Sequence, residues 1–303
     1  MNPLKRGAST RLHSAKGAAS APAPLDALPS ASAPAPGDYA EFLRTTLPRQ
    51  EKNVASHRLG SERVWLKKAG PRHGKWGYRV MAAVARMARL DIIKPVPNPG
   101  GEAAIATEAR RLKQLAAAGL RVPTVLAQQA DGLLISDLGE SGRATVVLQE
   151  RLDHAAAAGP AALLTVWREG LAAIAEVHVR GQHLSQAFDR NLVQCPDGVI
   201  GYIDFEDDPA EVMTLAECQA RDWLSYLHST AMMLEAAAPQ AAGLHWHAAL
   251  AGVNEEVRER IANAARRMKW ARKLPASRRW GRDTQRVRAV ARLLGQWHDA
   301  AAA

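Results

Sequence analysis

The stretch NLVQCPDGVIGYIDFEDDP, residues 191–209, decides how this chain is expected to fold. Asn191-Leu-Val-Gln and Val199-Ile-Gly-Tyr-Ile203 read as two short strands, and Pro196-Asp-Gly198 between them suits the tight turn of a β-hairpin. The hairpin begins at Asn191 and ends just before Asp204, so an amide oxygen and a carboxylate would lie side by side at its open end. Such hard oxygen ligands suit Mg²⁺, which takes one or two protein groups together with phosphate oxygens and water.

A long helical pattern leads to this hairpin. Residues 161–179 form the clearest helix of the chain, and a polar loop at 181–190 connects it to Asn191. The chain beyond residue 209 also reads as mainly helical. Hydrophobic residues make up 47% of the sequence, much of it Ala, and only 5% is aromatic. This composition favours helix-rich packing over an all-β sandwich.

The chain before residue 142 mixes strands with a helix. Gly60 and Gly70-Pro71 bound a short apolar strand, and Gly119 ends a helical pattern. The expected elements are strands at 63–67, 122–127 and 132–137, a helix at 102–118 and a compact turn at 138–142. The pattern predicts the α+β fold class.

Composition limits the class of protein. The 303 residues carry a formal charge of +10 with a pI near 10.0, which predicts attraction to polyanions such as nucleotides, nucleic acid or anionic lipid. Cys195 and Cys218 have neither metal-ligand spacing nor the density of a disulfide scaffold, and no apolar run is long enough for a membrane span. We therefore expect a cytoplasmic protein. Residues 1–37, rich in Ala, Pro and Ser, are expected to be a disordered tail.

Several short motifs resemble those of protein kinases. Val64-Trp-Leu-Lys67 resembles the strand with the phosphate-binding lysine, and Leu134-Ile-Ser-Asp-Leu-Gly139 resembles the hinge between lobes. Asn191 and Asp204 resemble the loop Asn and the Asp-Phe-Gly metal ligand. The likeness covers roughly residues 50–235 and is closest to the small bacterial lipopolysaccharide and Kdo kinases.

This resemblance implies a two-lobed, protein-kinase-like fold. A small mixed β/α N-lobe would span residues 38–142, with a basic insert near 72–100. A larger helical C-lobe would span residues 143–303, with a segment like a kinase catalytic loop at 181–206 and basic helices at its C-terminal end.

The resemblance also implies a role for each matched residue, with ATP and Mg²⁺ as cofactors. Lys67 would hold the phosphates, Glu108 would pair with Lys67, and backbone near Asp137 would meet the adenine, while Asn191 and Asp204 would bind Mg²⁺. Lys68 could replace Lys67. Since alternation along a strand puts Trp65 and Lys67 on one face, the direction of Trp65 decides between the two lysines.

The catalytic loop departs from the kinase pattern. Kinases place a catalytic Asp five residues before the Asn, and here that position is Gln186, which cannot take a proton from a hydroxyl. A gapped alignment puts Ser185 there instead. Asp189 is the nearby carboxylate that could replace the missing base if the loop takes an altered path.

The phosphate-binding parts depart as well. Glu206 replaces the final Gly of the Asp-Phe-Gly motif, and residues 53–63 lack the Gly-rich phosphate loop. Fewer backbone N–H groups would therefore face the phosphates. The acids Glu206, Asp207 and Asp208 could bind a second metal ion or form a solvated run, and the solvated run is the favoured interpretation.

Two basic regions stand out. Residues 75–90 read as a basic amphipathic helix, which could lie on an anionic membrane or pack on the domain. Residues 258–288 contain twelve Lys or Arg and two acids, with Trp270 and Trp280 interleaved. Aromatic residues among arginines could stack on bases or anchor in lipid headgroups. A lipid surface or an anionic glycolipid substrate is favoured over nucleic acid, because no recognisable nucleic-acid module surrounds the cluster.

Three functions follow from these patterns. The leading hypothesis is an ATP- and Mg²⁺-dependent phosphotransferase that acts on a lipid-linked sugar or a protein hydroxyl, peripherally on the inner membrane face. The first alternative is a pseudokinase scaffold, which Gln186 favours. The second is a protein that binds anionic polymers through its basic clusters.

Overall fold

The computed structural model describes residues 36–70, 96, 100–140 and 142–301. These residues belong to one compact unit of the chain with a mixed α+β fold, in which the sheets are small and antiparallel. Most of the expected tail at 1–37 and of the basic insert at 72–100, including the helix expected at 75–90, lies outside the described residues. None of the described helices is long and apolar enough to span a membrane.

The N-terminal part of the described chain contains a four-stranded antiparallel sheet, which contributes to the cavity described below. Its strands are β1 (Val54–Leu59), β2 (Glu62–Lys68), β3 (Val125–Gln129) and β4 (Gly132–Ser136), in the order β1-β2-β4-β3. β1 and β2 form a hairpin whose turn contains Gly60, and Gly60 has the positive φ of 62° that glycine tolerates best. The glycine-poor segment 53–63 is thus mostly strand.

One face of this sheet is closed by the first helix, α1 (Pro36–Thr46), and the turn after it, η1 (Leu47–Arg49). Alternation along β2 sends Val64 and Leu66 to this face, where they pack with Leu43 and Leu134. Trp65 and Lys67 therefore point to the opposite face.

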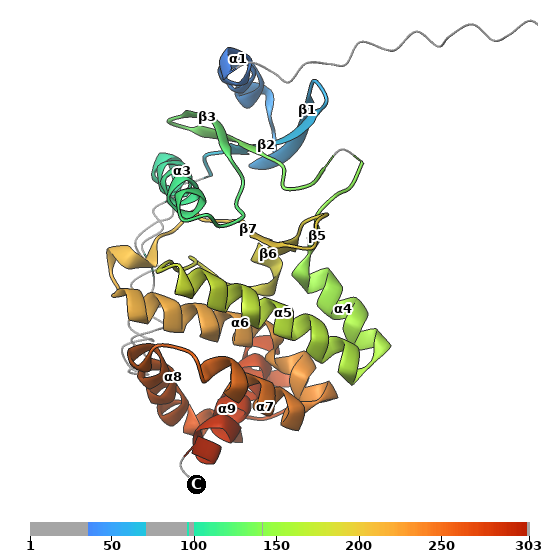
Figure 1. Ribbon diagram of the computed structural model, residues 1–303, viewed down its shortest axis with the longest axis vertical. Coiled ribbons are helices and arrows are strands. Elements are labelled where there is room, and N and C mark those ends of the chain that lie inside the picture. The colour runs from blue at the N-terminus through green and yellow to red at the C-terminus, as the bar shows by residue number, and fades with distance from the viewer. Residues whose placement is uncertain (1–35, 71–95, 97–99, 141, 302–303) are drawn as a thin grey trace, which may run out of the picture. The chain divides into compact units, whose positions relative to one another are not determined.

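Helix α3 (Gly101–Ala117) packs against β3 and β4 (Figure 1). Its buried apolar residues recur at helical spacing, as in Ile105, Ala109 and Leu112. Glu108 lies within the same buried stripe, so the packing of the helix carries a carboxylate into the interior.

The hairpin expected at 191–203 is present. β6 (Leu192–Gln194) and β7 (Ile200–Tyr202) pair antiparallel, and β5 (Val146–Val147) adds a third strand beside β6. Gly198 in the turn has φ 86°, which supports the prediction from the Asp-Gly sequence.

The rest of the described chain is helical, as expected. The longer helices are α4 (Leu148–Ala158), α5 (Pro160–Val179), α6 (Leu215–Ala237), α7 (Pro239–Leu250), α8 (Glu255–Arg267) and α9 (Arg282–Ala301). Short 3₁₀ turns are η3 (Asp189–Asn191), η4 (Pro209–Glu211), η5 (Lys269–Lys273) and η6 (Arg278–Trp280).

Helices α5 and α6 lie side by side and hold the core of this part (Figure 1). Gly170 on α5 allows the close approach, because a Cβ there would lie 2.1 Å from the Tyr226 hydroxyl oxygen on α6. That hydroxyl donates to the Trp167 carbonyl oxygen at 3.0 Å. Trp167 and Trp223 are fully buried around this contact. The end of α5 is thereby fixed where the loop toward Asn191 begins.

Candidate active site

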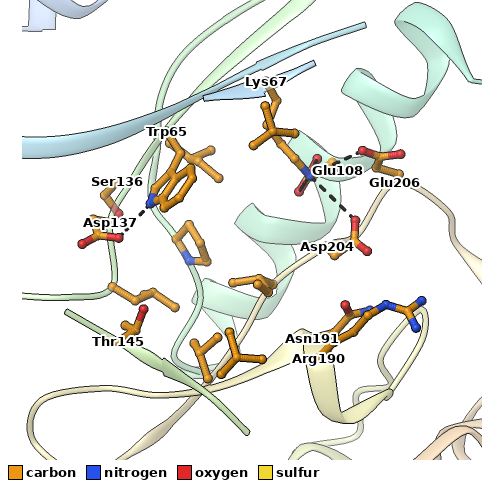
Figure 2. Close-up of a pocket in the computed structure, with 17 residues that line it drawn as sticks. Trp65, Lys67, Glu108, Ser136, Asp137, Thr145, Arg190, Asn191, Asp204 and Glu206 are labelled. Carbon is orange, nitrogen blue, oxygen red and sulfur yellow. Dashed lines mark hydrogen bonds and ion pairs between the residues drawn. The ribbon is translucent and has the colours of Figure 1, made fainter. Parts of the chain in front are cut away.

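A cavity of about 440 Å³ lies where β2, β4, α3 and the β6–β7 hairpin meet (Figure 2). One part of its lining is apolar and includes Trp65, Ile135, Leu138 and Val193. The polar part contains, among others, Lys67, Glu108, Arg190, Asn191, Asp204 and Glu206. The cavity therefore brings together four of the residues predicted for the site: Lys67, Glu108, Asn191 and Asp204. Asp137 also lines it.

Lys67 and Glu108 form a buried ion pair. The Lys67 ammonium donates to both Glu108 carboxylate oxygens at 2.7 Å, and Glu108 is only 1% exposed. Burial lowers the pKa of Lys67, but the neighbouring carboxylates outweigh burial and raise it above its ordinary value. Burial raises the pKa of Glu108 although Lys67 acts in the opposite direction. The two partners lie on β2 and α3, 41 positions apart in the sequence.

The direction of Trp65 settles which lysine faces the cavity. Trp65 and Lys67 both line it, whereas the ammonium of Lys68 donates to the carbonyl oxygen of Gln50 at 3.2 Å. Strand alternation thus separates the two adjacent lysines as expected, and Lys67 is the one beside Glu108.

Asp204 and Glu206 approach the same ammonium. Their carboxylate oxygens lie 3.8 Å and 3.5 Å from Lys67 Nζ (Figure 2). Asp204 has φ 74°, and within the described residues it is the one non-glycine residue with positive φ. Asp tolerates this left-handed conformation better than most residues, but the backbone still stores strain there. This conformation changes the direction of the chain just after β7 and leaves the Asp204 carboxylate at the cavity.

Asn191 is held by its amide nitrogen. Nδ2 donates to the Gln186 carbonyl oxygen at 3.0 Å, and the Ile203 N–H donates to the Asn191 carbonyl oxygen at 3.0 Å. Since the nitrogen is engaged, the amide oxygen is the atom that remains for a ligand. Figure 2 shows Asn191 and Asp204 on the same side of the cavity as Lys67, away from Asp137.

The cavity carries net negative charge. Two cationic side chains, Lys67 and Arg190, line it together with four carboxylates, those of Glu108, Asp137, Asp204 and Glu206, which gives a formal charge of −2. A site of this charge attracts cations. A free polyanion would meet repulsion there.

Trp65 and Asp137 are joined across the apolar end. The Trp65 indole N–H donates to Asp137 Oδ1 at 2.7 Å, and the Asp137 backbone N–H donates to the Arg63 carbonyl oxygen at 3.2 Å. The Asp137 N–H is therefore already hydrogen-bonded within the sheet. The adenine expected near Asp137 would have to bond to other backbone groups beside it. Trp65 lines the cavity although it was not among the predicted site residues; the strand alternation that puts it on the same face as Lys67 was the available signal.

The sequence also gave no sign of Arg190 as a lining residue. Its guanidinium carbon lies 4.5 Å from the centre of the Phe188 ring, a distance at which a cation and an aromatic face attract each other. This stacking holds an exposed cation at the edge of the cavity, on the side of Asn191.

Asp189 and Gln186, the two candidates for the catalytic position, are not among the cavity-lining residues. Asp189 is 4% exposed and accepts from the Arg190 N–H at 2.9 Å, and burial raises its pKa. Gln186 Nε2 donates to Asp207 Oδ2 at 3.0 Å. The loop path that would bring the Asp189 carboxylate into the cavity is absent here.

Two of the three acids after Asp204, namely Asp207 and Asp208, are buried, so the interpretation of a solvated run was wrong for them. Asp207 is 6% exposed, and burial raises its pKa although Gln186 donates to it. Asp208 accepts from His183 at 3.0 Å and from Arg110 at 2.8 Å. Burial alone would raise the pKa of Asp208, but these hydrogen bonds lower it below the ordinary value. Within the described residues, no group of three or more His, Cys, Asp or Glu side chains could hold a metal ion by itself.

Asp222 on α6 braces the loop that leads to Asn191. Its Oδ2 accepts from the His178 ring at 3.0 Å and from the Leu184 N–H at 2.8 Å. One buried carboxylate oxygen thus connects the end of α5 to the segment before Asn191.

Comparisons with known proteins add no relative: no family model matches the sequence, and no similar curated protein is found.

Proposed function

We propose that this chain is a kinase-like phosphotransferase that binds ATP with Mg²⁺ in the cavity between a small N-lobe (38–142) and a larger helical C-lobe (143–303). The observation that carries the proposal is the cavity itself. Its apolar end can hold a flat base, and its other end has the buried Lys67–Glu108 pair facing Asn191 and Asp204.

Each polar residue then has a defined task. Lys67 would donate to phosphate oxygens, and Glu108 keeps its ammonium in place and charged. Glu206, which lies 3.5 Å from Lys67 Nζ, would have to yield part of that contact when phosphate enters. Asp137 holds Trp65 beside the space proposed for the base.

The donor set suits Mg²⁺. The Asn191 amide oxygen and the Asp204 carboxylate would be its protein ligands, and the net charge of −2 favours a cation. When bound, the ion would neutralise phosphate charge. Two protein ligands are enough for this, because phosphate and water oxygens complete the shell.

The acceptor is proposed to be a hydroxyl of a lipid-linked sugar or of a protein at the cytoplasmic membrane face. The hydroxyl oxygen would bond to the terminal phosphorus, the bond from that phosphorus to the bridging oxygen would break, and the hydroxyl proton would pass to water. Gln186 lies outside the cavity lining, and its amide cannot take the proton of a hydroxyl. Since phosphoryl transfer depends mainly on positioning and charge, we expect slow rather than absent turnover.

A pseudokinase is the second candidate. The specific observation in its favour is that Asp189, the carboxylate nearest to Asn191 in sequence, is buried and outside the cavity lining. The same cavity would then bind nucleotide and serve a regulatory or scaffold role.

Thermal melting with ATP and Mg²⁺, each alone and together, tests the proposal. The combination should raise the melting temperature more than either alone, because a ligand at about 100 times its Kd stabilises the native state by about 2.7 kcal/mol. If millimolar Mg²⁺-ATP causes no shift, both candidates are refuted. Binding without any ATP turnover would leave the pseudokinase as the function.

A carboxylate at position 186 should raise turnover. In Gln186→Asp the new carboxylate can accept a proton once it reaches the acceptor hydroxyl, and a positioned base contributes about 10²-fold or more. The place of residue 186 outside the cavity lining and repulsion from Asp207 would lower this gain, so we expect at least a tenfold increase. ATP hydrolysis and acceptor-dependent ADP release measure it. Gln182→Asp, which adds the same charge elsewhere in the loop, is the matched control. If the turnover rate of Gln186→Asp is unchanged while nucleotide binding is normal, the lack of a catalytic base is not what limits the rate.

A further inference from the structure

A basic surface segment joins α8 to α9. Residues 266–282, RRMKWARKLPASRRWGR, contain eight Lys or Arg and no Asp or Glu. The segment includes the turns η5 and η6 and is here called the basic segment. It is separate from the residues that line the cavity.

Most of these charges have no acidic partner. Among the seven cations of the basic segment whose side chains the structure describes, Arg272 alone forms an ion pair, with Asp299 at 2.9 Å. Nearby arginines behave differently: Arg288 and Arg292 both pair with Glu235. The basic segment thus presents concentrated positive charge to its surroundings.

Two tryptophans of the same segment are exposed. Trp270 is 60% exposed and Trp280 is 66% exposed. The other described tryptophans are buried or partly buried: Trp65, Trp167, Trp223, Trp246 and Trp297. Indole rings are large apolar groups, and leaving two of them in water forgoes burial that the rest of the fold achieves. A partner that covers them would recover it.

The chemistry of the basic segment fits an anionic membrane surface. Lys and Arg near such a surface are attracted to the headgroups, and indole rings favour the boundary between headgroups and acyl chains. Leu274, Pro275 and Ala276 lie between the two turns, and Pro275 and Ala276 are exposed. These residues have no aromatic ring to stack on a nucleobase, so they match shallow insertion into lipid better than binding of a nucleic-acid strand.

We propose that the basic segment docks this protein on an anionic bilayer, with Trp270 and Trp280 inserted at the headgroup level. Charge complementarity and the pair of exposed indoles carry this inference, and it does not depend on nucleotide binding. Docking would place the protein at the membrane face whatever its cavity binds.

Vesicle co-sedimentation of the full chain without nucleotide tests it. Wild type should bind vesicles of equal parts phosphatidylcholine and phosphatidylglycerol, bind phosphatidylcholine vesicles at least tenfold more weakly, and lose binding as salt rises. Trp270→Ala/Trp280→Ala keeps every charge and should weaken binding at least tenfold. Lys269→Gln/Lys273→Gln/Arg279→Gln should weaken it roughly 100-fold, from roughly fivefold per charge.

Matched variants separate this surface from net charge. Arg58→Gln/Lys113→Gln/Arg168→Gln removes three exposed cations elsewhere, and Val179→Ala/Leu244→Ala removes two exposed apolar side chains elsewhere. Both should bind like wild type. The proposal would be overturned if either control variant lost as much vesicle binding as the matched variant of the basic segment. Binding to a single-stranded oligonucleotide that needs both tryptophans and displaces the vesicles would also overturn it. The melting temperature of every variant is measured as well, so that a loss of vesicle binding can be distinguished from a loss of folding.

Discussion

Asp204→Ala is expected to abolish the Mg²⁺-dependent part of nucleotide stabilisation. The change removes the one carboxylate at the open end of the hairpin that faces both Lys67 and the Asn191 side of the cavity. At Mg²⁺-ATP concentrations near 100 times the wild-type Kd the ligand contributes about 2.7 kcal/mol of stability, and the share of it that needs Mg²⁺ should be lost. Melting curves with ATP, with and without Mg²⁺, measure the loss.

The backbone at Asp204 determines the controls. Ala is strained at φ 74° and should lower the stability of the free protein by about 1–2 kcal/mol, so each variant is compared with its own unliganded form. Asp204→Asn tolerates this φ and keeps one oxygen, and should weaken the Mg²⁺ effect less. Asp197→Ala, in the turn of the same hairpin, should leave it unchanged. A normal Mg²⁺ response in Asp204→Ala would exclude the proposed metal ligand.

Lys67→Met should have the largest effect on stability. It leaves Glu108 buried without its main counter-charge, and folding then requires protonation of that carboxylate. From an unfolded pKa of about 4.3, the free energy of unfolding should fall by about 3–4 kcal/mol at pH 7. Chemical denaturation at several pH values measures it.

The pH dependence has a definite sign. Burial already raises the pKa of Glu108, and loss of Lys67 raises it further, so the folded state holds a proton that the unfolded state releases. The penalty should therefore grow as pH rises from about 4.3 to 7 and nearly vanish below about 4.3. A pH-independent loss would show that the cost comes from packing instead.

Two companion variants complete this test. Lys67→Met/Glu108→Gln removes both charges and should recover most of the stability at pH 7, because a neutral pair leaves no buried ion. It should still fail to bind nucleotide. Lys68→Met removes the adjacent lysine, whose ammonium binds the Gln50 carbonyl oxygen, and should cost less than about 1 kcal/mol.

Elements with local signals were predicted closely. The helix expected at 102–118 is present at Gly101–Ala117, and the strand expected at 63–67 is present at Glu62–Lys68. Both have glycine at a boundary and apolar residues at the right spacing. β1 (Val54–Leu59) was not predicted, because VASHRL has little apolar character and the strand lies at the edge of its sheet with alternate residues exposed. The backbone pairing with β2, rather than burial, makes it a strand.

The site was predictable where the chain is regular. Lys67, Glu108, Asn191 and Asp204 sit on or beside regular elements, and the cavity brings them together. The burial of Asp208 was not predictable, because its partner Arg110 comes from α3, 98 positions earlier. An acidic run in sequence looks solvated until such a distant cation is known.

The direction of Asp189 was equally beyond the sequence. Two residues from Asn191, its side chain could point into the cavity or away from it, depending on the path of an irregular loop. The short 3₁₀ turn η3 and the hydrogen bond from the Arg190 N–H hold the carboxylate in the protein interior, outside the cavity lining. Local sequence propensity does not determine which of the two directions the side chain takes.

The negative cavity lies within a protein whose formal charge is +10. At long range the net charge should speed the arrival of the anionic nucleotide proposed for this cavity, and this acceleration should weaken as salt is added. At contact, the four lining carboxylates should reject the nucleotide unless a divalent ion arrives with it. The association rate and the residence time would thus respond to different ions, with monovalent salt controlling the first and Mg²⁺ the second.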